Sequence, residues 1–183
     1  MKFLIAAALV LLAGCAATPE SLDAVARTES ARMSAPSRPF SSFANYELKP
    51  MTLSPAVLQE HGKVERAGEL DARMHAKLEP LFNEWRSAPK GPVHSGRLVI
   101  EPQLASLKVV SGGARFWAGA MAGNSNIDLD LSITDGDTGQ LIAKPRISMT
   151  ADAMAGGWSI GKTDTNLMDY IAAVSYQYLK DHY

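Results

Sequence analysis

A strictly alternating stretch near the middle of the chain constrains its fold more than any other feature. Between positions 127 and 133 every second residue is a large aliphatic one (Ile127, Leu129, Leu131 and Ile133), and the residues between them are polar. Because the side chains of a strand point alternately to its two faces, this pattern predicts a strand with one buried face and one face in water. Such a strand is typical of an antiparallel sheet that is covered on one side.

A turn and a second alternating stretch follow this strand. Residues 135–140 (DGDTGQ) are rich in Asp and Gly, which favour tight turns. In residues 141–152 the apolar residues Ile147, Met149 and Ala151 again alternate with polar ones. Two alternating stretches joined by a turn predict an antiparallel hairpin.

Two longer stretches have the spacing of amphipathic helices. In the first, apolar residues recur every three or four positions, which predicts one buried face. These residues are Val64, Ala67, Leu70, Met74, Leu78, Leu81 and Trp85. Pro80 lies inside this stretch and is expected to kink or split the helix. Residues 166–180 carry a second apolar stripe, made of Leu167, Ile171, Val174 and Tyr178.

Residues 40–53 and 97–110 favour further strands, the first with Phe43, Tyr46 and Leu48 as inward residues. The predicted element order is therefore β-α-β-β-β-α. We expect an α+β fold, in which an antiparallel sheet of three or four strands has two helices packed on one face.

The first fifteen residues, MKFLIAAALVLLAGC, predict a leader and not a part of the fold. Lys2 precedes an apolar run over residues 3–12, which is shorter than the roughly 20 residues that a bilayer span needs. This pattern indicates a secretory signal peptide over residues 1–14. The sequence Leu12, Ala13, Gly14 and Cys15 resembles the lipobox of bacterial lipoproteins. The resemblance implies cleavage before Cys15 and attachment of diacylglycerol and of a fatty acid such as palmitate to this residue.

The residue after the lipobox indicates which membrane would hold the protein. In similar lipoproteins an Asp at this position often causes retention in the inner membrane, whereas this chain has Ala16. We therefore expect a lipid-anchored protein of the outer membrane, on its periplasmic face.

The remaining sequence divides into two parts. Residues 15–39 are small and polar, and we expect a lipidated flexible tether there. Residues 40–183 are enough for a single periplasmic αβ domain. With 18 Lys and Arg against 19 Asp and Glu, the chain lacks the basic excess of nucleic-acid-binding proteins. Its one Cys excludes an intrachain disulfide and a Cys-based zinc site.

Two motifs could carry chemistry, and an argument opposes this interpretation of each. Residues 156–163 (GGWSIGKT) match the spacing of a phosphate-binding P-loop, but they lie too near the C-terminus for a nucleotide-binding parallel sheet to follow. Asp128 and Asp130 could act as paired catalytic carboxylates, although the alternation of the strand alone predicts polar residues at both positions. We predict no catalytic residue, no cofactor and no metal site.

The most unusual stretch is a glycine-rich segment over residues 112–124 (GGARFWAGAMAGN). Its side chains Arg115, Phe116, Trp117 and Met121 either fold back onto the core or contact a partner or a lipid surface. Trp158 lies in a second segment of similar type and is a candidate for the same contact.

These motifs together resemble uncharacterised bacterial envelope lipoproteins of the domain-of-unknown-function type, most closely over residues 127–143. A weaker similarity is to the small αβ domains of curli-secretion lipoproteins and of lipoprotein activators of cell-wall synthases. The resemblance implies a fold and supplies no catalytic residue.

Our leading hypothesis is a non-enzymatic binding or assembly module that is anchored in the membrane and contacts another envelope protein. The alternative is a cell-wall hydrolase or a ligand-binding protein that uses exposed carboxylates. Oligomerisation through a sheet edge is a third possibility. Nucleic acid is not an expected partner.

Overall fold

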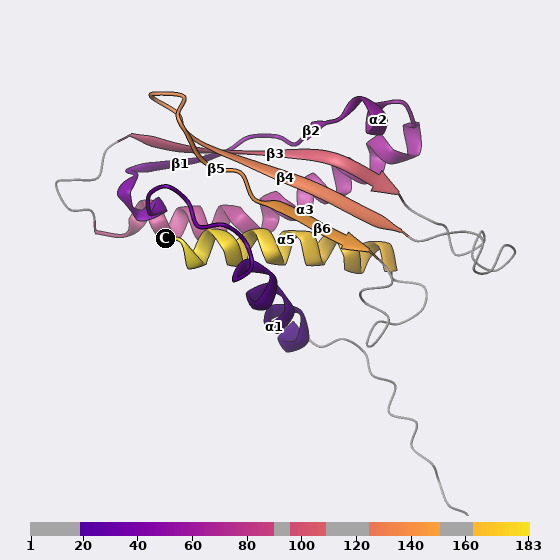
Figure 1. Cartoon of the computed structure of the whole chain (residues 1–183), viewed down its shortest axis with the longest axis horizontal. Helices are drawn as coiled ribbons and strands as arrows, with labels where there is room; N and C mark the ends of the chain where they lie inside the picture. Colours follow the sequence, from indigo (N-terminus) through magenta and orange to yellow (C-terminus); the bar gives the residue numbers. More distant parts are fainter. Residues whose placement is uncertain (1–18, 90–95, 109–124, 151–162) are drawn as a thin grey trace, which may run out of the picture.

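The computed structural model describes residues 19–89, 96–108, 125–150 and 163–183. These residues form a mixed six-stranded sheet with two long helices, α3 and α5, packed along one of its faces (Figure 1). The helices of the described part are α1 (Pro19–Ser30), the short 3-10 helix η1 (Phe40–Ser42), α2 (Pro55–Leu58), α3 (His61–Ser87) and α5 (Thr163–Asp181). The strands are β1 (Asn45–Leu48), β2 (Thr52–Leu53), β3 (Arg97–Lys108), β4 (Asn126–Asp135), β5 (Leu141–Ala143) and β6 (Arg146–Thr150). None of the helices in these residues is long and apolar enough to cross a bilayer.

The α+β class is confirmed, but the expected antiparallel sheet of three or four strands with two helices is wrong. Strands β1 and β2 both pair with β3 in parallel, while β4 pairs with β3 antiparallel and in turn carries β5 and β6. The parallel pairs arise because α2 and α3 connect β2 to β3, and a helical crossover of this kind returns the chain in the same direction. The extra strands arise at Pro50 and Pro145, because proline has no N–H for the strand ladder and interrupts each expected strand.

The alternation that predicted β4 is confirmed. Ile127, Leu129, Leu131 and Ile133 are fully buried against the helical layer. On β3 the same face carries Leu98, Ile100 and Leu104, and a bulge between Leu104 and Ser106 shifts the register so that Leu107 is buried too. Phe43, Tyr46 and Leu48 are also buried, as expected.

The long helix α3 is continuous through Pro80, so the expected split does not occur. Its predicted stripe is buried from Ala67 to Trp85, and Val64 at the first turn is exposed. Pro80 removes one backbone hydrogen bond of the helix. Burial of Leu78, Leu81 and Phe82 on either side of this position offsets that loss, since tertiary packing contributes most of the stability of a helix in a protein.

Helix α5 is the centre of the domain. It packs against β4 and β6 on one side, against α3 on a second side and against α1 on a third. Ten of its residues are buried: Leu167, Met168, Tyr170, Ile171, Ala172, Ala173, Val174, Ser175, Tyr178 and Leu179. Because apolar residues cover most sides of α5, the helix is stable only when other elements pack against most of those sides.

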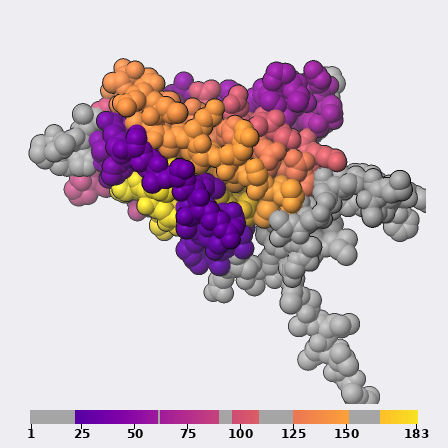
Figure 2. Space-filling view, in the orientation of Figure 1, coloured from indigo at the N-terminus to yellow at the C-terminus, as the bar shows by residue number. Residues whose placement is uncertain are grey.

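Helix α1 is one of those neighbours, and it lies inside the segment 15–39 that we expected to be a flexible tether. Ala26 and Ser30 are buried, and the Oγ atom of Ser30 donates a hydrogen bond of 2.6 Å to Oδ2 of Asp181. After α1 the chain stays attached, because the hydroxyl of Tyr178 donates to the carbonyl of Ser34. Figure 2 shows α1 and the segment after it lying across α5. Residues 19–39 therefore belong to the folded domain.

Candidate functional site

Most residues singled out from the sequence lie outside the described part of the chain. This holds for the lipobox residues Leu12, Ala13, Gly14 and Cys15. It also holds for the candidate contact residues, which are Arg115, Phe116, Trp117, Met121 and Trp158. Their roles remain predictions.

The structure does show where the two aromatic segments are attached. Lys108, Asn126 and Thr150 are consecutive partners across β3, β4 and β6. Residues 109–124 connect the ends of β3 and β4, and residues 151–162 leave from the end of β6. Both segments therefore start from the same end of the sheet, and the expectation that Trp158 lies beside the glycine-rich segment stays a prediction.

The face of the sheet opposite α3 and α5 is polar, and we call it the open sheet face. It carries Glu47, Arg97, Val99, Glu101, Gln103, Ser106, Asp128, Asp130, Ser132, Thr134, Arg146 and Ser148. Gln103, Arg146 and Ser148 are exposed. On β4 itself the alternation is confirmed, but Asp128, Ser132 and Thr134 are half-buried and Asp130 is buried, so the face that we expected in water is partly shielded.

Asp130 differs from the expected free carboxylate on this face. Arg146 on β6 donates from Nε to Oδ1 at 2.6 Å and from Nη2 to Oδ2 at 2.8 Å. Asp130 is 7% exposed, so its carboxylate is largely removed from water, whereas Arg146 is exposed. The hydrogen bonds from Arg146, together with the charges of Arg146 and Lys144, hold the pKa of Asp130 below its usual value, although burial opposes this effect.

This environment bears on catalysis by the pair Asp128 and Asp130. The two carboxylates lie on the same face of β4, and Asp128 is half-buried with the amide of Asn126 3.3 Å from its Oδ2. A general acid must hold a proton near neutral pH, and a bidentate contact with a guanidinium favours the ionised form. Asp130 is therefore arranged as a structural anion.

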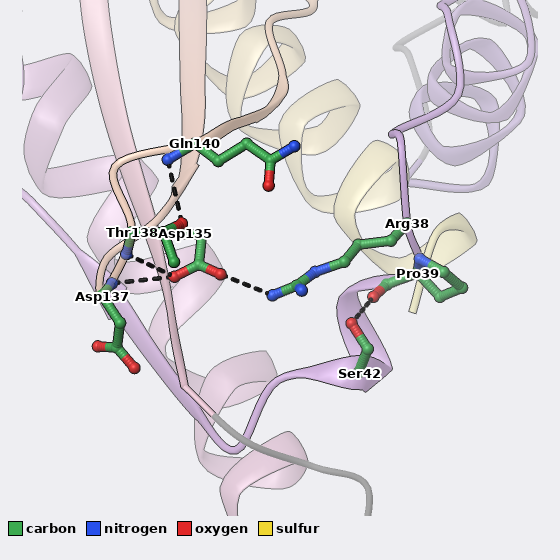
Figure 3. A network of polar contacts seen from close by, with 7 residues as sticks. All are labelled: Arg38, Pro39, Ser42, Asp135, Asp137, Thr138 and Gln140. Carbon is green, nitrogen blue, oxygen red and sulfur yellow. Dashed lines mark hydrogen bonds and ion pairs between the residues drawn. The ribbon is translucent and has the colours of Figure 1, made fainter.

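Asp135 organises the turn that follows β4. Its Oδ1 accepts hydrogen bonds from the backbone N–H groups of Asp137 at 2.9 Å and Thr138 at 3.2 Å, and its Oδ2 accepts one from Arg38 at 2.9 Å (Figure 3). The backbone bond from Asp137 is the main cause that lowers the pKa of Asp135. Gly139 closes the turn with φ of +74°, a conformation that glycine adopts freely. The predicted turn is confirmed, and Arg38 ties it to the segment after α1.

A pocket of about 290 Å³ lies between that segment and the β5–β6 connection. Its lining includes three cationic side chains, those of Arg32, Lys144 and Arg146. Arg32 is paired with Glu29, and Arg146 with Asp130. Sequence reasoning missed this pocket because it expected Arg32 to lie in a tether.

The described residues contain no group of three or more His, Cys, Asp or Glu side chains placed to hold a metal ion. The P-loop match over residues 156–163 lies almost entirely outside them. The strand before it, β6, pairs antiparallel with β4 and not in a parallel sheet.

No family model and no curated protein matches the chain. Among solved structures, a PelC dodecamer from Paraburkholderia phytofirmans aligns with 81% of this chain and 95% of its own, at 10% identity and a TM-score of 0.47. A protein of Xanthomonas campestris from the family DUF330 aligns over 75% and 81% of the two chains, at 6% identity and a TM-score of 0.37. A candidate lipoprotein of Caulobacter crescentus aligns over 85% and 89%, at 13% identity and a TM-score of 0.32. These three structures do not show the similarity to curli-secretion lipoproteins or to cell-wall-synthase activators.

Proposed function

We propose that this chain is a lipoprotein of the outer membrane whose periplasmic domain is a non-enzymatic binding or assembly module for another envelope component. The observation that carries the proposal is the leader that ends in Leu12, Ala13, Gly14 and Cys15, with Cys15 the only cysteine of the chain. Acyl chains on this residue would confine the domain to the membrane and raise its effective concentration near membrane-bound partners.

The contact with the partner lies at the end of the sheet that bears both aromatic segments. Phe116 and Trp117 belong to the first segment and Trp158 to the second, and the ends of β3, β4 and β6 supply a rigid base for both. Large aromatic side chains contribute much of the binding energy in protein interfaces.

The ion pair between Asp130 and Arg146 supports a binding role over the alternative of a hydrolase. A hydrolase with two carboxylates needs one of them protonated at working pH, and Arg146 stabilises the ionised form of Asp130.

Crosslinking in intact cells tests the proposal. The double variant F116A/W117A is compared with the wild type and with a control, Leu141→Ala, which removes an exposed apolar side chain of β5 that pairs with the opposite end of β4. We expect the wild type and the control to yield the same crosslinked envelope protein and F116A/W117A to lose it, with unchanged thermal unfolding. Equal crosslinking in all three proteins would contradict the assignment of the contact.

A further inference from the structure

We propose that the domain docks on the membrane with its helical face, formed by α1 and the seam between α3 and α5, and directs the open sheet face away from the bilayer. The occupant of the helical face is then a phospholipid surface. This inference rests on the proposed lipidation of Cys15 and adds the orientation of the domain to it.

The first argument is the length of chain between the lipid and the fold. Helix α1 begins at Pro19, four residues after Cys15. Four residues span at most about 14 Å even when fully extended. Since α1 is part of the domain, its N-terminal end must lie within this distance of the lipidated residue.

The second argument is the position of α1 in the layers of the fold. It packs on α5, and Figure 1 shows it on the side of α5 away from the sheet. Between α1 and the open sheet face lies at least the thickness of α5, about 10–12 Å, and then the sheet itself. With the radius of α1 added, the path from its N-terminal end to that face is longer than the chain that is free to span it.

The third argument is the chemistry of the seam. On its outer side the ring of Tyr176 lies under two ammonium groups, with Nζ of Lys77 at 5.0 Å and Nζ of Lys180 at 5.7 Å from the ring centre. Both lysines are exposed, and neither is ion-paired with another described residue. Beside them Arg73 is paired with Asp169 at 2.5 Å. The two lysines are therefore the excess positive charge of the group formed by Lys77, Lys180, Arg73 and Asp169.

A tyrosine between lysines suits the boundary of a membrane. Tyrosine places an apolar ring and a polar hydroxyl at the level of the headgroups, and lysine is attracted to anionic phospholipids. On the open sheet face the cations Arg97 and Arg146 are paired with Glu47 and Asp130. The further carboxylates of this face, Glu101 and Asp128, are repelled by an anionic surface.

The test places a fluorophore on each face of the lipidated full chain. Ala76 is exposed on α3 opposite its buried stripe, and Gln103 is exposed on the open sheet face. Each is replaced by Cys and labelled, since acylation blocks the thiol of Cys15. The proteins are reconstituted in vesicles of phosphatidylcholine and phosphatidylglycerol that contain a lipid with a spin label in its headgroup, which quenches nearby fluorophores.

We expect several-fold stronger quenching of the fluorophore at position 76 than at position 103. The substitutions K77E/K180E should reduce quenching at position 76 at low salt, and the charge-matched control R97E/K108E should not. Equal quenching at both positions, or stronger quenching at 103, would overturn the orientation while flotation of the protein with the vesicles still supports anchoring. Failure of the wild type to float would overturn the anchoring itself.

Discussion

The Oγ atom of Ser30, at the end of α1, lies 2.6 Å from Oδ2 of Asp181, in the last turn of α5. The two residues are 151 positions apart in the sequence, and their contact joins the start of the described chain to its end. Ser30 is buried and Asp181 is exposed, so this hydrogen bond is shielded from water on the side of its donor.

Ser30→Ala should therefore destabilise the domain. A hydrogen bond to a charged group contributes about 1.5–3 kcal/mol, and we expect a loss in that range in the free energy of unfolding measured with urea. The control is Thr28→Ala, which removes an exposed hydroxyl from the same helix. A deletion of residues 19–39 should cost more, because it also removes the packing of α1 on α5 and the hydrogen bond from Tyr178 to the carbonyl of Ser34. If S30A and T28A were equally stable, α1 would not be held as the structure describes.

Arg146→Ala should destabilise the domain through Asp130. The variant leaves a nearly buried carboxylate without its two hydrogen bonds, and we expect a loss of about 1–3 kcal/mol. The double variant D130N/R146A should recover part of this loss, because it no longer buries an unpaired charge. A cycle of the single and double variants in urea unfolding measures the coupling, and a coupling of zero would contradict the pair.

The same pair predicts a dependence on pH. The pKa of Asp130 is lower in the folded protein than the value of about 3.9 that an unfolded chain has. The stabilisation is thus fully present above the unfolded-state pKa and is lost as the pH falls through the folded-state pKa. The difference in unfolding free energy between the wild type and R146A should be constant from pH 5 to 7 and shrink as the pH falls below about 4. A difference that grows in acid would contradict this assignment.

Two glycines should respond to alanine in opposite directions. Gly68 lies inside α3, and a Cβ added there meets no atom within 4 Å, so Gly68→Ala should stabilise the domain by about 0.8–1 kcal/mol through helix propensity. Gly139 also has free space around it but has φ of +74°, so Gly139→Ala should destabilise by about 1–2 kcal/mol through backbone strain alone. Thermal unfolding of both variants checks the signs.

The elements with a strong local pattern could be predicted from the sequence. The alternation in β4, the stripe of α3 and that of α5 each follow from one periodicity that burial then confirms. The parallel pairing of β1 with β3 could not be predicted, because it depends on where a long crossover returns the chain. Local pattern cannot report such a long-range relationship.

Helix α1 was missed for a related reason. Its sequence is polar, and it is stabilised by its contact with α5 and not by a wide apolar face of its own. Leu22, Ala26 and Ser30 recur every fourth residue, and this narrow stripe was the available signal. For the candidate site, the strand alternation predicted that Asp130 lies on the face opposite the helices. It could not predict that Arg146 is its partner, because that depends on the register of β6 against β4.

Metabolic labelling with radioactive palmitate tests the central claim most directly. We expect the wild-type chain to carry the label and to sediment with outer membranes, and Cys15→Ser to carry none and to leave the membrane fraction. An unlabelled wild type, or a Cys15→Ser variant that still sediments with the membrane, would contradict the account.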